Sequence, residues 1–254
     1  MRALVTGAGK RLGRAMALHL AQEGYDVAVH YASSGEAAAE VVAEIRSLGR
    51  KSCSLQADLL APDAARALLP QAAAALGGEI TCLINNASIF EPDRLQNASD
   101  DSWNRHFGSN LRAPFLLIQA MAKQALAPVR DAQGEPRAAG LVVNMVDQKI
   151  RSLTPDFMTY TLAKSALWTL TQTAAQELAP RLRVNAIGPG PTLANPYQAP
   201  EEFAKQRAST ILKRGANAGD ITGALSYLLA APAVTGQLIC VDGGQHLVWE
   251  NQGA

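Results

Sequence analysis

The sequence predicts the α/β fold class, with about seven parallel strands in a doubly wound sheet that carries helices on both faces. Three observations lead to this prediction. Short apolar runs alternate with longer helical runs along nearly the whole chain. The apolar runs are nearly continuous, which is typical of strands buried on both faces. A glycine-rich turn joins the first strand to the first helix.

The composition fits a folded protein in a reducing compartment. The chain has 254 residues, 48% of them apolar, and a net charge of +1. This charge gives no general attraction to nucleic acid or to a membrane, so neither is predicted as a partner. The cysteines lie far apart without a C-x-x-C motif, which argues against zinc and against a disulfide framework. The chain starts with a strand and has no apolar run of membrane-spanning length, so we expect a cytoplasmic protein without a metal.

The predicted elements alternate along residues 1–254, which we expect to form a single domain. Strands are predicted at 3–6, 26–31, 52–57, 80–85, 141–146, 183–187 and 237–241. Helices are predicted at 14–24, 36–49, 62–76, 99–127, 156–178, 200–212 and 218–229. The polar stretch 130–139 is predicted to be a surface connection, because the alternation continues beyond it. Right-handed crossovers place all strand carboxyl ends at one edge of the sheet, where ligands bind in such folds.

The turn from Gly7 to Gly13 predicts a phosphate site. Backbone N–H groups at the amino end of a helix can bind a pyrophosphate. The alternative is an ordinary turn, but the preceding strand and the following helix both support the phosphate interpretation. Lys10 and Arg11 lie within this turn.

The end of the second strand predicts NADPH rather than NADH. A protein that prefers NAD usually places Asp or Glu there, where it binds the ribose 2′-hydroxyl. This sequence has no acid there and reads His30-Tyr31-Ala32-Ser33-Ser34. Cations of the glycine turn and these hydroxyls suit a 2′-phosphate. The alternative for Arg11 is a solvated turn residue.

Two further strand ends carry candidates with open alternatives. Asp58 could meet the adenine amino group, or it could only cap the helix at 62–76. The proline-rich loop 188–196 could border a ligand, or it could be a plain connection. The sequence leaves both questions open.

Tyr160 and Lys164 are predicted to share one face of a helix, near the strand end that carries Asp147. A phenol has an ordinary pKa of about 10, and a nearby positive charge lowers it toward neutrality. We therefore expect Lys164 to lower the pKa of Tyr160 and to make it a proton donor. A surface pair on an amphipathic helix is the alternative, and the glycine turn favours the catalytic interpretation.

Together these motifs resemble the short-chain dehydrogenase/reductase family over essentially the whole chain. The matching positions occur in family order: Thr6-Gly7 to Gly13, Asp58, Asn85-Asn86-Ala87, Asn110, Tyr160-x-x-x-Lys164, Pro189-Gly190 and Asp242-Gly243-Gly244. The resemblance implies a Rossmann-type domain, a nicotinamide-dependent oxidoreductase and a homotetramer.

Two departures from the family pattern are similar to pteridine reductases and dihydromonapterin reductases. Arg11 replaces the middle glycine of the turn, and Asp147 replaces the usual catalytic serine. That branch also has T-G-A-x-K-R-L-G, an H-Y strand end and N-N-A-S-x-F, which match Thr6 to Gly13, His30-Tyr31 and Asn85 to Phe90.

The aspartate changes the chemistry that the site can support. A serine hydroxyl suits a ketone because it donates to a developing alkoxide. A buried carboxyl beside a phenol can hold the proton that a pterin C=N bond requires, whereas an ionised carboxylate repels an oxyanion. Phe90 would stack on the flat pterin, or it would only pack in the core. Asp147 could also be a drifted residue in an inactive relative.

The residues and the resemblance together give the predicted site. The catalytic residues are Asn110, Asp147, Tyr160 and Lys164, and the substrate-binding residues are Phe90, Asp147, Tyr160 and Pro191. The cofactor-binding residues are Gly7, Lys10, Arg11, Leu12, Gly13, His30, Tyr31, Ser33, Ser34, Asp58, Asn86, Ala87, Ser88, Tyr160, Lys164, Pro189 and Gly190.

This site predicts an NADPH-dependent reductase of a small-molecule substrate, a dihydropterin or dihydrofolate, with loop 191–200 closing over it. The alternatives are a carbonyl or alcohol oxidoreductase, such as a 3-oxoacyl reductase, and a nucleotide-binding protein without turnover. The tail 245–254, which contains Trp249, is expected to reach a neighbouring subunit of the tetramer.

Overall fold

The computed structural model describes residues 1–194 and 198–249, and it confirms the predicted fold class. Seven parallel strands form the main sheet in the order β3-β2-β1-β4-β7-β8-β9. They are β1 (Arg2–Val5), β2 (Asp26–Tyr31), β3 (Ser52–Gln56), β4 (Cys82–Asn85), β7 (Gly140–Met145), β8 (Leu182–Pro189) and β9 (Leu238–Val241). The order changes direction between β1 and β4, which makes this the switch point where ligands bind in open α/β sheets.

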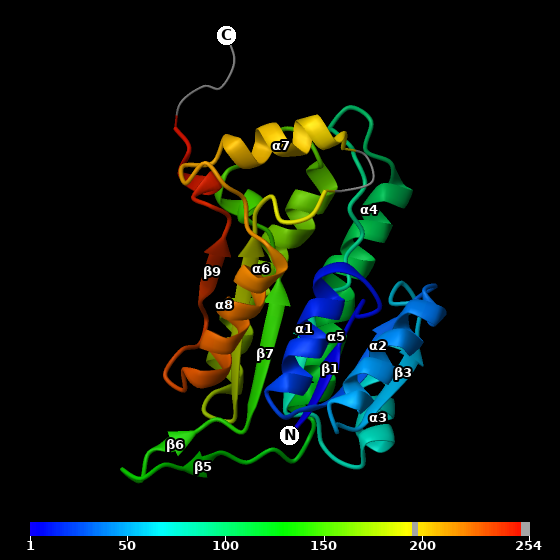
Figure 1. The fold of residues 1–254 in the computed structure, drawn as a ribbon, viewed down its shortest axis with the longest axis vertical. Helices are drawn as coiled ribbons and strands as arrows, with labels where there is room; N and C mark the ends of the chain where they lie inside the picture. The colour runs from blue at the N-terminus through cyan, green and yellow to red at the C-terminus, as the bar shows by residue number, and fades with distance from the viewer. Residues whose placement is uncertain (195–197, 250–254) are drawn as a thin grey trace.

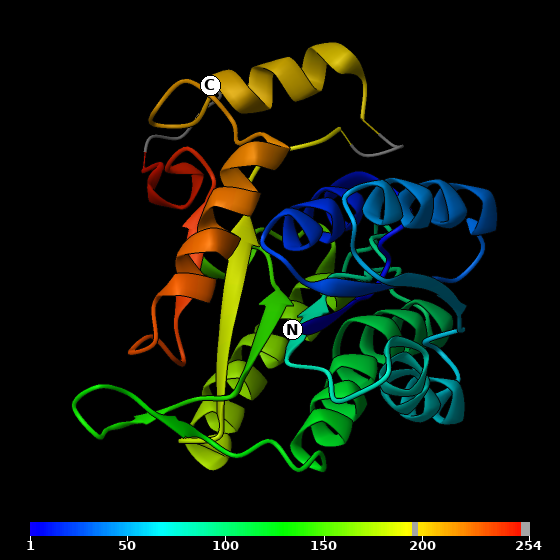
Figure 2. The same ribbon diagram turned by 60° about the horizontal axis from the view of Figure 1, so that its bottom comes forward.

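Helices cover both faces of the sheet, as Figures 1 and 2 show. One face carries α1 (Arg11–Gln22), α2 (Gly35–Ser47) and α8 (Ala218–Ala230). The other carries α3 (Pro62–Leu76), α4 (Asp100–Phe107), α5 (Ala113–Ala122) and α6 (Met158–Leu178).

Each central strand contributes to two cores, one under each helical layer. In β1, Ala3 and Val5 pack with α1, α2 and α8, whereas Leu4 packs with α3, α5 and α6. Successive side chains of a strand point to opposite faces. Both faces of the sheet are therefore buried, which is why the strands have nearly continuous apolar sequences.

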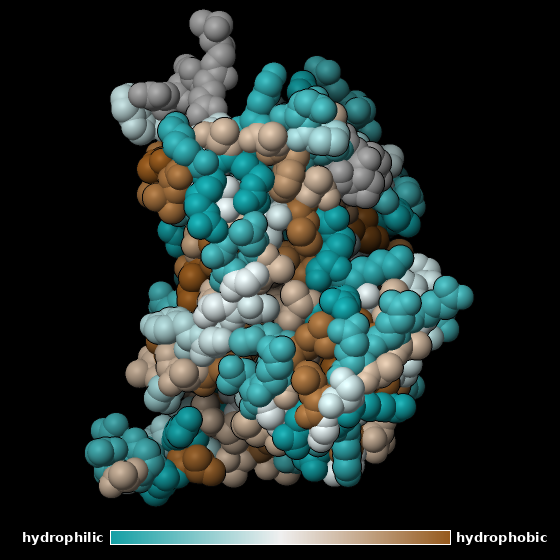
Figure 3. Space-filling model, in the orientation of Figure 1, coloured by the Kyte–Doolittle hydropathy of each residue, from teal (hydrophilic) through white to brown (hydrophobic). Residues whose placement is uncertain are grey.

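Helix α7 (Pro200–Ala208) lies across the carboxyl edge of the sheet, beyond the arrowheads of β7 and β9 in Figure 1. None of its residues is buried. In Figure 3 mainly hydrophilic side chains cover this top of the molecule, and apolar side chains are visible in the hollow beneath it. This helix therefore covers the edge where the predicted site residues gather.

Several boundaries differ from the prediction. The helix predicted at 99–127 is interrupted by a π-helical turn, η1 (Gly108–Arg112), and α5 ends at Ala122. Helix α6 begins at Met158, because Phe157 before it has a left-handed φ of 59°. Helix α7 ends at Ala208 rather than 212.

The polar connection 130–139 is exposed, as predicted, but it contains a small hairpin. Strands β5 (Val129–Arg130) and β6 (Pro136–Arg137) pair antiparallel to one another. The hairpin projects from the body of the molecule in Figures 1 and 2, and its surface in Figure 3 is mostly hydrophilic.

Three predictions remain: the roles of loop 191–200 and of the tail 245–254, the absence of a membrane span, and the absence of a metal site. Loop 191–200 and the tail 245–254 include residues 195–197 and 250–254, which lie outside the described residues. Within the described ranges, no helix is long and apolar enough to cross a membrane. Over the same ranges, no group of three or more His, Cys, Asp or Glu side chains is arranged to hold a metal ion.

Candidate active site

A cavity of about 820 Å³ lies at the carboxyl edge of the sheet. This size is within the usual range for small-molecule and cofactor sites. Every predicted cofactor-binding and substrate-binding residue lines the cavity. Of the predicted catalytic residues, Asp147, Tyr160 and Lys164 also line it, and Asn110 does not.

Side chains from neighbouring strands shape the glycine turn. The N–H of Gly7 donates to Nδ1 of His30 over 3.0 Å, and Nε2 of His30 lies 3.1 Å from the carbonyl oxygen of Ala57. Burial lowers the pKa of His30, in agreement with a neutral ring that accepts at Nδ1. Nδ2 of Asn86 donates to the carbonyl oxygens of Thr6 and Gly7. His30 and Asn86 therefore hold the turn itself, which the sequence did not predict.

The amino end of α1 is open to an anion. The helix has no acidic residue in its first turn and no side-chain cap, so its first N–H groups are available. A Cβ at Gly13 would lie 2.1 Å from the carbonyl oxygen of Gly7, which explains the requirement for glycine there. Lys10 is exposed at the same end and lines the cavity.

The end of the cavity near β2 and β3 contains Tyr31, Ser33, Ser34 and Asp58. The carboxylate of Asp58 accepts the N–H of Leu60 over 2.9 Å, and α3 has no side-chain cap. Asp58 therefore does not cap the following helix, and its predicted contact with the adenine stays a prediction.

Arg11 connects the glycine turn to the loop after β8. Its Nη1 donates to the carbonyl oxygen of Ala194 over 2.8 Å, and its Nη2 donates to that of Leu193 over 3.1 Å. Arg11 also has a left-handed φ of 54° at a position where the family usually has glycine. Arg11 is thus exposed but tied to this loop, and its predicted contact with phosphate stays a prediction.

Asp147, Tyr160 and Lys164 meet at the end of β7. The hydroxyl of Tyr160 donates to Oδ2 of Asp147 over 2.7 Å, and the N–H of Lys149 donates to Oδ1 over 2.8 Å. Nζ of Lys164 donates to the carbonyl oxygen of Met145 over 2.7 Å and lies 5.6 Å from the centroid of the Tyr160 ring. Lys164 is only 2% exposed, so its charge is largely removed from water.

The electrostatics of this group differ from the prediction. Burial and then the Asp147 carboxylate raise the pKa of Tyr160 well above its ordinary value, so the expectation that Lys164 lowers it is wrong. Burial also raises the pKa of Asp147, although the hydrogen bonds from Lys149 and Tyr160 oppose this. Burial lowers the pKa of Lys164 to about 8, against the attraction of Asp147. The pKa values of the carboxyl and the ammonium therefore move toward neutrality, and that of the phenol moves away from it.

Phe90 lines the cavity next to Tyr160. Its ring stacks on Phe157, with centroids 4.1 Å apart and planes 11° apart, and it meets the Tyr160 ring edge-on at 4.7 Å. Phe157 does not line the cavity. Phe90 thus packs against Phe157 and Tyr160 and also borders the cavity. Packing within the protein therefore does not exclude a contact with a ligand.

Asn110 lies behind the cavity wall rather than in it. It is completely buried in η1, and its carboxamide accepts the N–H and donates to the carbonyl oxygen of Ile89. The π-helical turn therefore directs this side chain to the segment after β4. Both ends of the amide are used there, so Asn110 positions the wall and does not touch the cavity.

The cavity also includes residues that the sequence analysis missed. They come from the segments after β3, β4, β7 and β9, from α4 and from the α7 region, and include Leu59, Leu60, Glu91, Arg105, Gln148, Thr192, Leu193, Gln198, Phe203, Gln206 and Gln245. Phe203 and Gln206 are three residues apart on one face of α7, a spacing that the sequence contains. Nothing in the sequence indicates that this face covers the cavity.

Glutamines are prominent among the missed residues. Gln148 is 8% exposed, and its carboxamide oxygen has no hydrogen-bond partner among the described residues. The same holds for the carboxamide oxygen of Gln245. Nε2 of Gln198 donates to Oε1 of Gln206 over 2.9 Å. A buried polar atom without a partner is uncommon and suggests a site that a ligand completes.

The fold and the cavity define a class of Rossmann-type proteins in which a Tyr-x-x-x-Lys helix faces a glycine turn. A family model described as enoyl-(acyl carrier protein) reductase matches residues 7–246. The chain belongs to the short-chain dehydrogenase/reductase family, which confirms the resemblance at this level.

The chain is similar to relatives with different names. It is 33% identical over 250 residues to the 3-oxoacyl-[acyl-carrier-protein] reductase FabG of Staphylococcus epidermidis, over 96% of this chain and 98% of that protein. It is 41% identical to the crystal structure of FolM alternative dihydrofolate reductase 1 from Brucella suis in complex with NADP, with a TM-score of 0.90 over 99% of this chain and 97% of that chain. It is 31% identical to a blue fluorescent protein from a metagenomic library in complex with NADPH, with a TM-score of 0.84 over 96% and 97% of the two chains.

Proposed function

We propose that the protein is an NADPH-dependent reductase that adds a hydride to a ring C=N bond of a dihydropterin or dihydrofolate. The hydrogen bond from Tyr160 to Asp147, at the position of the usual family serine, carries the proposal. The similarity to the FolM alternative dihydrofolate reductase 1 supports it, since that relative is 41% identical.

The residues around the glycine turn fit NADPH. The open end of α1 would receive the cofactor phosphates with Gly7, Arg11 and Gly13. Lys10, Arg11, Ser33 and Ser34 would lie by the 2′-phosphate, Asp58 would approach the adenine, and Lys164 would bind the nicotinamide ribose. The bound cofactor supplies the hydride. The NADP and NADPH complexes of similar structures support this assignment.

Asp147 is the proposed proton donor to the substrate nitrogen. Its pKa is raised by burial, so the carboxyl can carry a proton closer to neutral pH than an exposed carboxyl can. The hydroxyl of Tyr160, 2.7 Å away, can relay a proton to it, taking one from water as it gives up its own. One hydride at carbon and one proton at nitrogen complete the reduction of a C=N bond. Phe90 would stack on the pterin from the cavity wall.

A 3-oxoacyl reductase is the second candidate, because the FabG relative covers nearly the whole chain at 33% identity. Ketone reduction develops negative charge on oxygen, which donors stabilise and a carboxylate opposes. Asp147 therefore counts against this candidate, and against other simple carbonyl substrates.

An assay of NADPH oxidation over dihydromonapterin, dihydrobiopterin, dihydrofolate and a panel of ketones tests the proposal. We expect turnover with at least one pterin at an ordinary enzyme rate, above about 1 s⁻¹. If every pterin is inert and a ketone turns over at that rate, the pterin assignment fails. If NADPH binds but is not oxidised in the presence of any of these substrates, the protein is a nucleotide-binding protein without turnover.

The cofactor assignment has a separate test. The ratio of kcat/KM for NADPH to that for NADH is measured for the wild type and for Arg11→Ala. We expect the wild type to prefer NADPH and the variant to lose part of that preference, because a cation near the 2′-phosphate is removed. Equal use of both cofactors by the wild type would contradict our interpretation of Arg11.

We also propose a homotetramer, in which α4 and α5 face a neighbouring subunit. Trp103 and Phe115 are 46% and 47% exposed, and Phe107, Leu111 and Phe115 border an apolar hollow of about 440 Å³ on this face. Exposed apolar patches of this kind are typical of contact surfaces. Sedimentation at micromolar concentration checks the proposal, and a mass of one chain would contradict it. Trp249, 84% exposed, would contact a neighbour if the tail does.

A further inference from the structure

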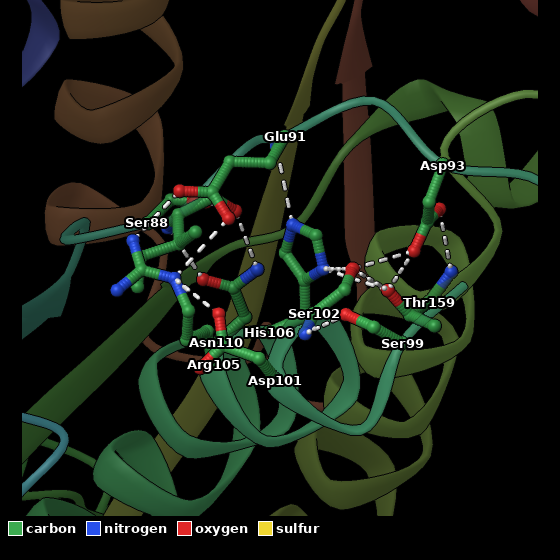
Figure 4. Close-up of polar contacts among 11 residues, drawn as sticks. Ser88, Glu91, Asp93, Ser99, Asp101, Ser102, Arg105, His106, Asn110 and Thr159 are labelled. Carbon is green, nitrogen blue, oxygen red and sulfur yellow. Dashed lines mark hydrogen bonds and ion pairs between the residues drawn. The ribbon is translucent and has the colours of Figure 1, made fainter. Parts of the chain in front are cut away.

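A buried polar network links α4 to both sides of the candidate active site (Figure 4). Its centre is His106, which is completely buried and lies between Glu91 and Thr159. Nε2 of His106 accepts the N–H of Glu91 over 3.1 Å, and Nδ1 lies 2.7 Å from the hydroxyl oxygen of Thr159. Glu91 follows Phe90 in sequence, and Thr159 precedes Tyr160. The network therefore connects the segment that carries Phe90 to the helix that carries Tyr160.

Asp93 completes the network from the other side. Oδ2 of Asp93 accepts the hydroxyls of Thr159 and Ser102, and Oδ1 accepts the N–H of Thr159 over 3.2 Å. Burial alone would raise the pKa of Asp93, but these hydrogen bonds outweigh it and hold the pKa below its usual value. Asp93 is therefore an ionised acceptor under most conditions.

The backbone of Asp93 caps the amino end of α6, which has no side-chain cap of its own. Phe157, the residue before the helix, has no side-chain cap and a left-handed φ of 59°. The carbonyl oxygen of Asp93 accepts the N–H groups of Phe157 over 2.8 Å and Met158 over 3.4 Å. The first turn of the helix that carries Tyr160 thus depends on a segment more than sixty residues earlier in the chain.

The direction of the hydrogen bonds requires a neutral His106. The N–H of Glu91 can only donate, so Nε2 must be unprotonated, and the ring proton is at Nδ1, where it faces Thr159. The hydroxyl of Thr159 then donates its own hydrogen bond to Asp93. Protonation of Nε2 would make it a donor that faces another donor, the N–H of Glu91, and this hydrogen bond would be lost.

We propose that His106 and Asp93 are positioning residues of the reductase, which act through Thr159 to fix the segment carrying Phe90 against the first turn of α6 carrying Tyr160. They do not touch the cavity and so take no part in the chemistry itself. A shift of about 1 Å between reacting groups can cost about 10²-fold in rate, so such positioning has a measurable effect. The inference rests on the proposed role of Tyr160 but not on the identity of the substrate.

The network predicts a loss of activity in acid. The groups that face His106 are Asp93, Glu91, Arg105 and the Tyr160 ring. Burial lowers the pKa of His106 below 6.5, while Asp93 and Glu91 oppose this shift. Because the folded pKa is lowered, the neutral ring and its hydrogen bond to Glu91 persist somewhat below pH 6.5 and are lost as the pH falls further.

A pair of substitutions at Thr159 tests the proposal. Thr159→Val removes the hydroxyl that accepts from His106 and donates to Asp93, and Thr159→Ser retains it. We expect Thr159→Val to lower kcat by at least about tenfold while the Kd for NADPH is unchanged, and Thr159→Ser to restore most of the activity. The assay uses whichever substrate the wild type turns over, so a failure of the pterin assignment is distinguishable from a failure here. Wild-type kcat in Thr159→Val, or equal losses in both variants, would overturn the proposal.

The pH profile gives a second test that does not depend on Thr159. His106→Gln offers a carboxamide oxygen that can accept the N–H of Glu91 at any pH. We expect the wild-type kcat to fall on the acid side of pH 6.5 and this fall to disappear in His106→Gln, whereas His106→Phe should be impaired at every pH. An acid limb that is identical in the wild type and in His106→Gln would overturn the role of His106.

Discussion

The two ends of the cavity are built in different ways. Around the glycine turn, the polar atoms of Thr6, His30 and Asn86 bond to other protein groups and shape the backbone. Around Asp147 and the α7 region, buried carboxamide oxygens of Gln148 and Gln245 have no partner among the described residues. At the first end the side chains are satisfied within the protein and only backbone N–H groups of α1 stay available, whereas the second end has side-chain hydrogen-bonding capacity left over.

This difference suggests how the two ligands are recognised. A preformed backbone turn suits a cofactor whose phosphates are always the same. Neutral carboxamides without partners suit a substrate with neutral polar groups, because they can both donate and accept. Changes at the first end should therefore alter cofactor binding, and changes at the second should alter turnover.

The largest effect is expected at Tyr160. Tyr160→Phe removes the hydroxyl that donates to Asp147 and should lower kcat by about 10²- to 10⁴-fold, the range for a lost acid–base group. Steady-state kinetics and an NADPH titration check this, and the Kd for NADPH should be nearly unchanged. Tyr227→Phe is the matched control, because Tyr227 is 54% exposed and far from the site in sequence. A similar small loss in both variants would contradict the role of the Tyr160 hydroxyl.

The next effect is expected at the glycine turn. Gly13→Ala places a Cβ 2.1 Å from the carbonyl oxygen of Gly7, and overpacking of this kind costs about 1–3 kcal/mol. If the turn moves to relieve it, the Kd for NADPH should rise about tenfold. Fluorescence titration measures this. Gly223→Ala is the control, since a Cβ there meets nothing within 4 Å and alanine favours the helix. Unchanged NADPH affinity and stability in Gly13→Ala would show that the turn is not tightly constrained.

A smaller effect is expected from pH at Lys164. Burial lowers its pKa to about 8, so the ammonium is lost as the pH rises through this value. We expect kcat/KM to fall on the alkaline side of pH 8, because the positive charge beside Asp147 and Tyr160 disappears. For stability the sign is opposite: the unfolded chain holds this proton to higher pH, so this group favours folding increasingly between pH 8 and 10.5. Lys164→Arg should lack the alkaline limb, and a limb retained in that variant would assign it to another group.

The smallest effect is expected on stability, at Asp147. Because burial raises its folded pKa, its favourable contribution is present only at low pH and is lost as the pH rises through that pKa. Asp147→Asn removes the buried charge and should raise Tm at pH 8 more than below pH 3.8, the ordinary pKa of this carboxyl, where the proton is bound in the folded chain. Thermal unfolding at the two pH values checks this. A lower Tm at pH 8 would mean that the carboxylate stabilises the fold through its hydrogen bonds.

The sequence predicted the parts of the molecule that local patterns determine. The strands follow from continuous apolar runs, and the cofactor end follows from the glycine turn and the absence of an acid after β2. Tyr160 and Lys164 were found because a helix places residues four apart on one face. These features depend on short segments whose physical requirements are visible in the sequence.

The remaining features depend on contacts between distant segments. The cap that Asp93 provides for α6, the buried His106 and the cover formed by α7 join segments that no sequence period relates. The shift in the pKa of Tyr160 was predicted with the wrong sign, because burial and the Asp147 carboxylate raise it. Burial can be judged only once the surrounding elements are in place.

The most direct test of the account is the preference for a C=N bond over a ketone, measured as the ratio of kcat/KM for a dihydropterin to that for a ketone. The ratio is determined for the wild type and for Asp147→Ser, which restores the usual family residue. We expect the wild type to favour the pterin, and Asp147→Ser to lose pterin turnover by about 10²-fold while ketone turnover rises. If Asp147→Ser reduces the pterin as fast as the wild type does, the carboxyl is not the proton donor and the central claim is contradicted.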